Sequence, residues 1–514
     1  MSKRTKTTLL FGIIALGFLL RWASLYWGEG YEHSHIGDEL EAYRYALGLR
    51  AGKERAAYIG QPNFRGGKLA GPLWTWFWLV GLKMGGSPEA VSLLVLVLNT
   101  FVIYIVYRLA ENILGSDYSL WAALFCATAP WAVFFSAGCW NPLPMAFLGG
   151  LLYVALWDVV TRPNSWNIFG VCVLTAIMSQ FHMIVIFIAP VVILIVWLCN
   201  SRLNRCWLAA GLLASVALYI PYIHGEATHG WQNTRSILHG DTSASPAVLK
   251  VFTLPIMGLS NLLSGATKAE ISIYRAFGNA YFGSYWILAV LNVLSLVLSA
   301  IIVVSFLVHL FQSLRGNWRS PRQVFASAPN EAFIGLLLVL PLLLFVLSFY
   351  NYSSRYMIVQ FPLLFLLPAL FMVRKHHTGG WRRLVRVMII LMIAFGAIFS
   401  LANSHYQGVL LQKADYFLPS FRKMESVRRQ LKADAGANQR IHLDDSAFPR
   451  TGPRGYVDGI GYLARYIDIR DRYDPLTASA QQVKTYRALP AKDALAASER
   501  IVYKTNGVVF VSSE

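Results

Sequence analysis

The segment PEAVSLLVLVLNTFVIYIVY, residues 88–107, contains one charged side chain and is otherwise almost entirely apolar. A helix needs about 20 mostly apolar residues to cross the hydrocarbon core of a bilayer, so this segment predicts a transmembrane helix. Similar runs lie at residues 9–26, 119–137, 143–160, 167–181, 183–199, 207–222, 281–311, 332–350, 356–373 and 384–402. The chain is therefore predicted to be an all-α polytopic membrane protein with about eleven transmembrane helices.

The composition agrees with a membrane location. The 514 residues are 56% hydrophobic and 14% charged, and the apolar residues come in runs, which excludes an ordinary soluble domain. The five cysteines lie in or beside the apolar runs and show no Cys-x-x-Cys spacing. Neither a disulfide framework nor a thiolate metal site is predicted.

Lysine and arginine predict the orientation, because short cytoplasmic loops retain these residues. With the N-terminus in the cytoplasm, every cytoplasmic connection is basic, as shown by Lys3, Arg108, Arg162, Arg202, Arg315 and Arg374. An odd number of spans then places the C-terminal segment outside, in the periplasm if the membrane is a bacterial inner membrane. The net charge of +19 largely reflects this bias, and no nucleic-acid partner is predicted.

Two domains are predicted. Residues 1–402 form the transmembrane domain, with external loops at 27–86 and 223–280, and residues 403–514 form a small extracytoplasmic α/β domain. Within the tail, helices are predicted at 416–433 and 456–468, a strand at 440–443, and a hairpin with an Asn-Gly turn at 501–513.

The first external loop contains HSHIGDELEAYRYALGLRAGKERAAY, residues 33–58. Asp38 with Glu41 three residues later is typical of a capping box, and Leu40, Tyr43 and Leu47 share one helical face. These features predict a helix that starts at Asp38 and lies along the membrane surface. The Trp-rich segment at 66–84 is predicted to form an interfacial hairpin.

Three basic or imidazole side chains in external positions suit a phosphate. Arg355 opens the apolar segment SSRYMIVQFPLLFLLP, residues 353–368, where its guanidinium offers planar donors to phosphate oxygens. Lys68 and His182 are further candidates. The structural alternatives are an arginine that snorkels to the interface, a solvated interfacial lysine and a histidine that only stabilises its turn.

A divalent cation is a further possibility for the first loop. His33 and His35 precede Asp38 in an H-x-H-x-x-D pattern, and imidazole with carboxylate suits zinc or manganese. The spacing specifies no further ligand, so these two histidines are weak candidates and no cofactor is assigned.

Several motifs, in this order, resemble those of the GT-C-type glycosyltransferases that use polyprenyl-phosphate sugars, the superfamily of protein O-mannosyltransferases and lipid A aminoarabinose transferases. The motifs are LLRWASLYW (19–27), GDELEAYRYA (37–46), KLAGPLWTWFW (68–78) and the Arg-Tyr pair at 355–356. The resemblance covers roughly residues 9–402. Two departures are a loosened Lys-Pro-Pro-like element, here Lys68 to Pro72, and a tail that matches no known part.

The resemblance implies a membrane glycosyltransferase of the hexosyl or pentosyl type. It would invert the sugar while moving it from a polyprenyl-phosphate donor, among membrane lipids, to a lipid, glycan or protein acceptor on the outer face. Asp38, with Glu39 in reserve, is expected beside the acceptor nucleophile. Donor phosphate contacts are expected from Arg355, Tyr356, Lys68 and His182.

Three alternatives remain open from the sequence. An oligosaccharide polymerase or ligase would also use external arginines, but it would transfer a whole glycan. A lipid or sugar transporter would carry ionisable residues or broken helices near the middle of the membrane, and the candidate breaks are Pro130, Pro190, Pro341 and Pro362. A membrane scaffold that only presents the tail would tolerate substitution of Asp38 and Arg355.

Overall fold

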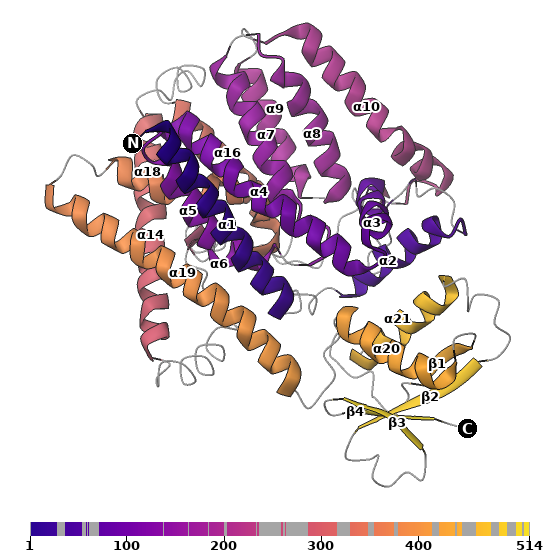
Figure 1. Cartoon of the computed structure of the whole chain (residues 1–514). Coiled ribbons are helices and arrows are strands. Elements are labelled where there is room, and N and C mark those ends of the chain that lie inside the picture. The colour runs from indigo at the N-terminus through magenta and orange to yellow at the C-terminus, as the bar shows by residue number, and fades with distance from the viewer. Residues whose placement is uncertain are drawn as a thin grey trace.

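The structure is a computed structural model of the whole chain. It describes residues 2–27, 36–53, 58, 60, 71–136, 138–162, 164–182, 184–199, 203–232, 234–235, 259–260, 263, 286–315, 329–347, 354–374, 379–413, 421–436, 439–444, 459–473, 483–490, 500–505 and 508–512. Figure 1 shows a large helical bundle with a small α/β unit beside one of its ends. The all-α bundle and the small C-terminal α/β unit confirm the predicted fold class.

The bundle consists of helices that coincide with the predicted apolar runs. They are α1 (Lys3–Trp27), α4 (Pro88–Leu114), α5 (Ser119–Thr128), α6 (Pro130–Phe134), α7 (Met145–Thr161), α8 (Asn167–Phe181), α9 (Val185–Leu198), α10 (Arg205–Thr228), α14 (Trp286–Arg315), α16 (Pro329–Leu347), η2 (Ser354–Gln360), α17 (Phe361–Leu364), α18 (Leu367–Arg374) and α19 (Gly379–Lys413). Within the described residues, five helices are long and apolar enough to cross a membrane. The protein is a multi-pass membrane protein, while the number of eleven crossings stays a prediction.

Contacts at the two ends of the bundle agree with the alternating order of spans. At one end, Lys6 Nζ donates to Ser116 Oγ at 2.8 Å, and Asn330 Nδ2 donates to the Ile113 carbonyl at 2.9 Å. At the other end, the rings of Tyr58 and His224 lie 4.9 Å apart, which joins the two predicted external loops. This second end is called the outer end below.

Of the four prolines predicted as candidate helix breaks, two interrupt helices, whereas the prediction is wrong for the two that lie inside continuous helices. Pro130 separates α5 from α6, and Pro362 lies in the short segment between η2 and α18, whereas Pro190 and Pro341 lie inside α9 and α16. A proline has no N–H, so the carbonyl four residues earlier loses its helical donor. Inside a bilayer no water replaces that donor, and a side chain must do so.

Arg21 supplies this donor at the α5–α6 break. Its guanidinium donates to the carbonyls of Cys126 and Ala127, and Cys126 is the residue four positions before Pro130. It also donates to the Gly17 carbonyl and to Ser136 Oγ, and the side chain is only 1% exposed. Arg21 is therefore buried in the bundle, where it satisfies backbone carbonyls.

Gln360 plays the same part for Pro341, and Gln180 makes a bond close to a third proline. Gln360 Nε2 donates to the carbonyls of Leu337, four residues before Pro341, and Leu338, at 2.9 and 3.2 Å. Gln180 Nε2 donates to the Leu218 carbonyl at 2.9 Å, three residues before the proline inside α10. These buried side chains tie neighbouring helices together where the helical hydrogen-bond ladder is incomplete.

Two helices from the first external loop cover the outer end. α2 (Ile36–Arg50) and α3 (Pro72–Gly85) pack on each other, and α3 also packs on α4 and α8. The predicted apolar face of α2 is buried, but it contacts α3 and α21 of the C-terminal unit. The interfacial hairpin predicted at 66–84 is wrong for its described part, because Pro72 starts one helix that ends at Gly86 in a left-handed conformation.

The C-terminal unit contains α20 (Phe421–Ala435), β1 (Arg440–Asp444), α21 (Gly459–Tyr473), β2 (Val483–Pro490), β3 (Arg500–Thr505) and β4 (Val508–Ser512). The sheet order is β1-β2-β4-β3, with β1 parallel to β2 and the other neighbours antiparallel. Met424, Val427 and Leu431 form the apolar stripe of α20. The predicted helices, strand and hairpin are present, and β2 is an addition.

The division into two domains stays a prediction. α19 continues to Lys413, beyond the predicted boundary at residue 402, and α20 begins at Phe421.

The donor role of Gln360 gives a testable coupling with Pro341. We expect Gln360→Leu to destabilise the protein, because the Leu337 carbonyl loses its donor. In a Pro341→Ala background the amide of residue 341 takes over, so the cost should fall by about 1 kcal/mol. Thermal unfolding of the four proteins in one detergent measures this coupling, and an equal cost of Gln360→Leu in both backgrounds would contradict the assignment.

Candidate active site

The two predicted acidic residues lie at the start of α2. The helix begins at Ile36, so Asp38 is in the first turn and is not the N-cap that the sequence predicted. A carboxylate in the first turn still interacts favourably with the helix dipole. Glu39 is 2% exposed, whereas the side chain of Asp38 lies outside the described residues.

The predicted phosphate-binding pair lies on a second short element. Arg355 and Tyr356 belong to the 3-10 helix η2, and their side chains are outside the described residues. Lys68, His33 and His35 lie outside the described residues altogether. Their contacts with a donor phosphate or a metal ion therefore stay predictions.

A glycine of α7 fixes the position of η2. A Cβ on Gly149 would lie 2.6 Å from the Val359 carbonyl oxygen, so only glycine permits this close approach. At the end of η2, Gln360 bonds to α16 as described above. η2 is thus held between α7 and α16, a few residues from Arg355.

His182 has a structural role in the turn between α8 and α9. Its Nδ1 accepts a hydrogen bond from the Ile184 amide at 3.1 Å, and the side chain is 8% exposed. In the neutral ring the proton is therefore on Nε2. The contact of His182 with a phosphate stays a prediction.

Aromatic contacts connect α2 with the outer end of α8. The ring centroids of Tyr43 and Trp78 lie 5.9 Å apart, those of Trp78 and Trp74 6.2 Å, and those of Trp74 and Phe181 6.0 Å. Such edge and offset arrangements stabilise pairs of aromatic rings beyond their buried area. This row places the helix that carries Asp38 against the bundle.

The same contacts continue towards η2. Asn141 Nδ2 donates to the Phe181 carbonyl at 3.0 Å, and Asn99 of α4 donates to the carbonyls of Phe135 and Leu143 in the α6–α7 connection. The Phe135 ring in turn lies 6.1 Å from that of Phe361, which directly follows η2. α2 and η2 thus belong to one connected set of elements.

A small cavity lies beneath this connection and has room for about one water molecule. Arg21, Asn99 and Ser136 give it polar walls, and Ile358 and Phe361 are among its apolar ones. Asn99 Oδ1 is buried and has no hydrogen-bond partner among the described residues. A structural water suits this place, and the cavity is too small for a sugar.

A metal site receives no support from the described part of the chain, where no three His, Cys, Asp or Glu side chains come together.

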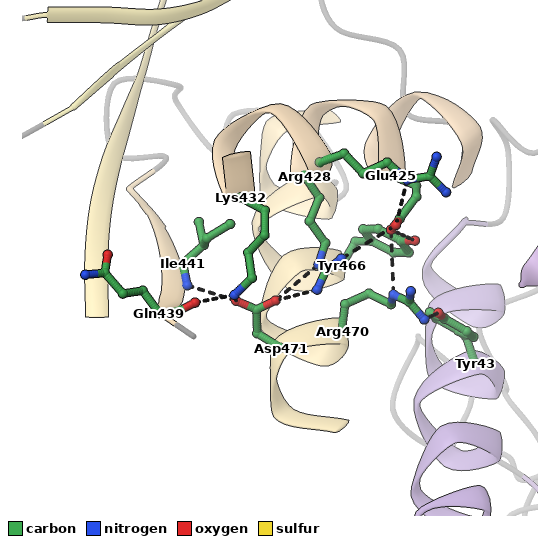
Figure 2. A network of polar contacts seen from close by, with 10 residues as sticks. Tyr43, Glu425, Arg428, Lys432, Gln439, Ile441, Tyr466, Arg470 and Asp471 are labelled. Carbon is green, nitrogen blue, oxygen red and sulfur yellow. Dashed lines mark hydrogen bonds and ion pairs between the residues drawn. The ribbon is translucent and has the colours of Figure 1, made fainter. Parts of the chain in front are cut away.

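Charged contacts that the sequence did not predict join α2 to the C-terminal unit (Figure 2). Arg470 Nη1 donates to the Tyr43 hydroxyl at 2.9 Å, and Arg470 Nε lies 3.6 Å from Glu425 Oε2. The Tyr466 hydroxyl donates to the same Glu425 oxygen at 2.7 Å, and its ring stacks on that of Tyr43. Arg465 donates to Glu41, which lies one helical turn after Asp38 in α2.

The electrostatics of this contact follow from burial. Burial raises the pKa of Tyr43 to about 12, although Arg470 opposes the shift. Burial alone would lower the pKa of Arg470, but Tyr43, Tyr466 and Glu425 raise it above its usual value. Burial also lowers the pKa of Arg465. At neutral pH both arginines are therefore cations and both tyrosines are protonated. Arg470 faces Glu425 and Tyr43, and Arg465 faces Glu41.

A buried ion pair holds the C-terminal unit together behind this contact. Arg428 of α20 donates from Nε and Nη2 to Asp471 Oδ1 at 3.1 and 2.9 Å, and the other Asp471 oxygen accepts the Ile441 amide of β1. Both side chains are buried, and the pair ties α20, α21 and β1 into one body (Figure 2).

A multi-pass helical bundle, the two helices α2 and α3 after the first span and a small C-terminal α/β unit define the class of structure. Neither a protein-family model nor a curated protein matches the sequence. Among solved structures, ArnT from Cupriavidus metallidurans bound to undecaprenyl phosphate aligns over 98% of both chains, with 11% identity and a TM-score of 0.58. Its apo state aligns over the same shares, with 11% identity and a TM-score of 0.56. The chain therefore has the GT-C fold.

A more distant likeness is to the Archaeoglobus fulgidus oligosaccharyltransferase tethered with an acceptor peptide. It covers 96% of this chain and 70% of that chain, with 11% identity and a TM-score of 0.47.

The close approach at Gly149 gives a matched pair of substitutions. Gly149→Ala should destabilise the protein by about 1–3 kcal/mol, because the new Cβ meets the Val359 carbonyl. Gly170→Ala, on the neighbouring α8, meets only the Ala155 Cβ at 3.9 Å and should be neutral or slightly stabilising. Thermal unfolding in detergent compares them, and an equally stable Gly149→Ala protein would show that η2 is not held in this way.

Proposed function

We propose that this protein is an inverting membrane glycosyltransferase that moves a single sugar from a polyprenyl-phosphate donor to a lipid, glycan or protein acceptor. The observation that carries the proposal is the connected set of contacts between the start of α2, with Asp38 and Glu39, and η2, with Arg355 and Tyr356. The GT-C fold supports it, since one structure with this fold is ArnT bound to undecaprenyl phosphate.

The chemistry requires positive charge at the leaving group. In the proposed step the acceptor hydroxyl attacks the anomeric carbon, the bond from that carbon to the phosphate oxygen breaks, and the lipid phosphate leaves with the electron pair. Preorganised donors at the developing negative charge stabilise such a transition state. Arg355 is the proposed donor, with Tyr356, Lys68 and His182 as further contacts.

The acceptor side requires a carboxylate. Asp38 is proposed to orient the acceptor hydroxyl and to take its proton. Its place in the first turn of α2, where the helix dipole favours the ionised form, suits an orienting and polarising role better than that of a strong base. Glu39 is buried beside it and is the alternative.

The proposed location is a bacterial inner membrane, with the N-terminus in the cytoplasm and the C-terminal unit in the periplasm. The transfer would then take place at the outer end, where α2, α3 and η2 lie and where water and the bilayer interface are both accessible. The basic connections support this orientation.

The buried Arg21 does not favour the transporter alternative. The buried ionisable side chain in α1, Arg21, donates to carbonyls that surround a proline break, so it has a structural explanation. No described feature favours transfer of a whole glycan, and the mass of the product distinguishes that reaction from single-sugar transfer.

Two substitutions should separate donor binding from transfer. Arg355→Ala should weaken binding of polyprenyl phosphate by about tenfold to a hundredfold, the equivalent of one lost charged hydrogen bond. Asp38→Asn should leave this binding unchanged and lower the rate of sugar transfer by about a hundredfold or more. Native mass spectrometry with polyprenyl phosphate measures the first effect, and single-turnover transfer from a polyprenyl-phosphate sugar measures the second.

Arg383→Ala is the matched control for Arg355, since Arg383 is an exposed arginine at the opposite end of the bundle. Full binding by Arg355→Ala would remove the proposed phosphate contact, and full transfer by Asp38→Asn would remove the proposed acceptor contact. Absence of lipid binding and of transfer in the wild-type protein would overturn the proposed function.

A further inference from the structure

The C-terminal unit is attached to the bundle by its contacts with α2 as well as by the chain. α19 ends at Lys413 and α20 begins at Phe421, so one covalent connection joins the unit to the bundle. Contacts between α21 and α2, with fewer between α20 and α4, then determine how the unit sits (Figure 1). The unit lies against α2, whose first turn contains Asp38 and Glu39.

The α2–α21 interface holds α2 at three levels. Arg465 donates to Glu41, Arg470 Nη1 donates to the Tyr43 hydroxyl at 2.9 Å, and Lys53 Nζ, just beyond the helix, donates to the Arg472 carbonyl at 2.7 Å. Two of these contacts lie near the start of α2, and the third lies just beyond its end. Such contacts fix both the axial position and the rotation of the helix, because successive side chains point in directions about 100° apart around the helix axis.

Arg470 is itself held by contacts within the C-terminal unit. Glu425 pairs with Arg470 and accepts from Tyr466, while the Arg428–Asp471 pair fixes α20 against α21 (Figure 2). On the other side, Tyr43 and Trp78 place α2 against α3. α2 therefore lies between two supports, and its first turn is only one turn away from Glu41.

We propose that the C-terminal unit positions the start of α2 for transfer, and that Arg465 and Arg470 are positioning residues that act through Glu41 and Tyr43. The inference rests on the proposed function, because it assigns Asp38 and Glu39 to the reaction. A misplacement of a reacting group by about 1 Å lowers a rate by about a hundredfold. Loss of the interface therefore affects the transfer rate while the donor phosphate site at η2 remains intact.

Charge reversal tests the interface in the full-length protein. The variants are Glu41→Arg, Arg465→Glu and the double swap, with Tyr43→Phe as a mild variant that keeps the ring stacking and loses only the bond from Arg470. We expect each single reversal to raise amide hydrogen exchange in residues 36–50 by about tenfold or more. The transfer kcat should fall by about a hundredfold with little change in the KM for the lipid donor.

The double swap should restore most of both readouts, while the bond that Glu41 also accepts from Arg44 Nε at 3.2 Å stays lost, and Tyr43→Phe should show smaller effects of the same kind. The control is the pair within α4, Arg108 and Glu111, whose charge swap reverses the same charges at the opposite end of the bundle from α2. It should change neither α2 exchange nor kcat.

If the single reversals leave amide exchange in α2 unchanged, the positioning role is wrong, whatever the transfer rate. The positioning role is also wrong if Glu41→Arg and Arg465→Glu raise the exchange but keep the full kcat. If the exchange results are as expected but the wild-type protein transfers no sugar from a polyprenyl-phosphate donor, the proposed function fails and the α2–α21 interface stands.

Discussion

A backbone carbonyl that loses its donor inside a bilayer must find another, and this requirement shapes the bundle. Pro130 and Pro341 remove the amides that would bond to Cys126 and Leu337, and Arg21 and Gln360 replace them. Each replacement requires the desolvation of a long polar side chain, but an unsatisfied carbonyl in hydrocarbon would cost roughly several kcal/mol. The buried polar residues of the bundle are therefore part of its backbone bonding.

These replacements also determine where the candidate active site lies. Gln360 is the last residue of η2, the 3-10 helix that contains Arg355. The side chain that replaces the missing donor in α16 therefore also holds the element with the candidate phosphate contact. Arg21 and Asn99 hold the connection around α6, which in turn contacts α8 and the segment after η2. The outer end is thus built from short elements that the proline breaks allow, and α2 is placed on it by aromatic rings.

Much of the architecture could be predicted because single segments encode it. Apolar runs of membrane length mark the bundle helices, and the stripe of Met424, Val427 and Leu431 marks α20. The central strand β2 could not be predicted in this way: its sequence VKTYRALP is largely polar and ends in proline, and among its described side chains only Tyr486 and Ala488 are buried. The bond between Glu41 and Arg465 joins residues 424 positions apart, and no local pattern shows such a pair. The start of α2 at Ile36 differed from the prediction because Asp38 suits a first turn as well as an N-cap.

The most direct measurement is a structure of the protein in a lipid nanodisc with a bound polyprenyl-phosphate sugar. The account predicts that the phosphate lies at the outer end within hydrogen-bond reach of Arg355, with the anomeric carbon facing the first turn of α2. A phosphate bound at the opposite end of the bundle, or a sugar directed away from Asp38 and Glu39, would contradict it.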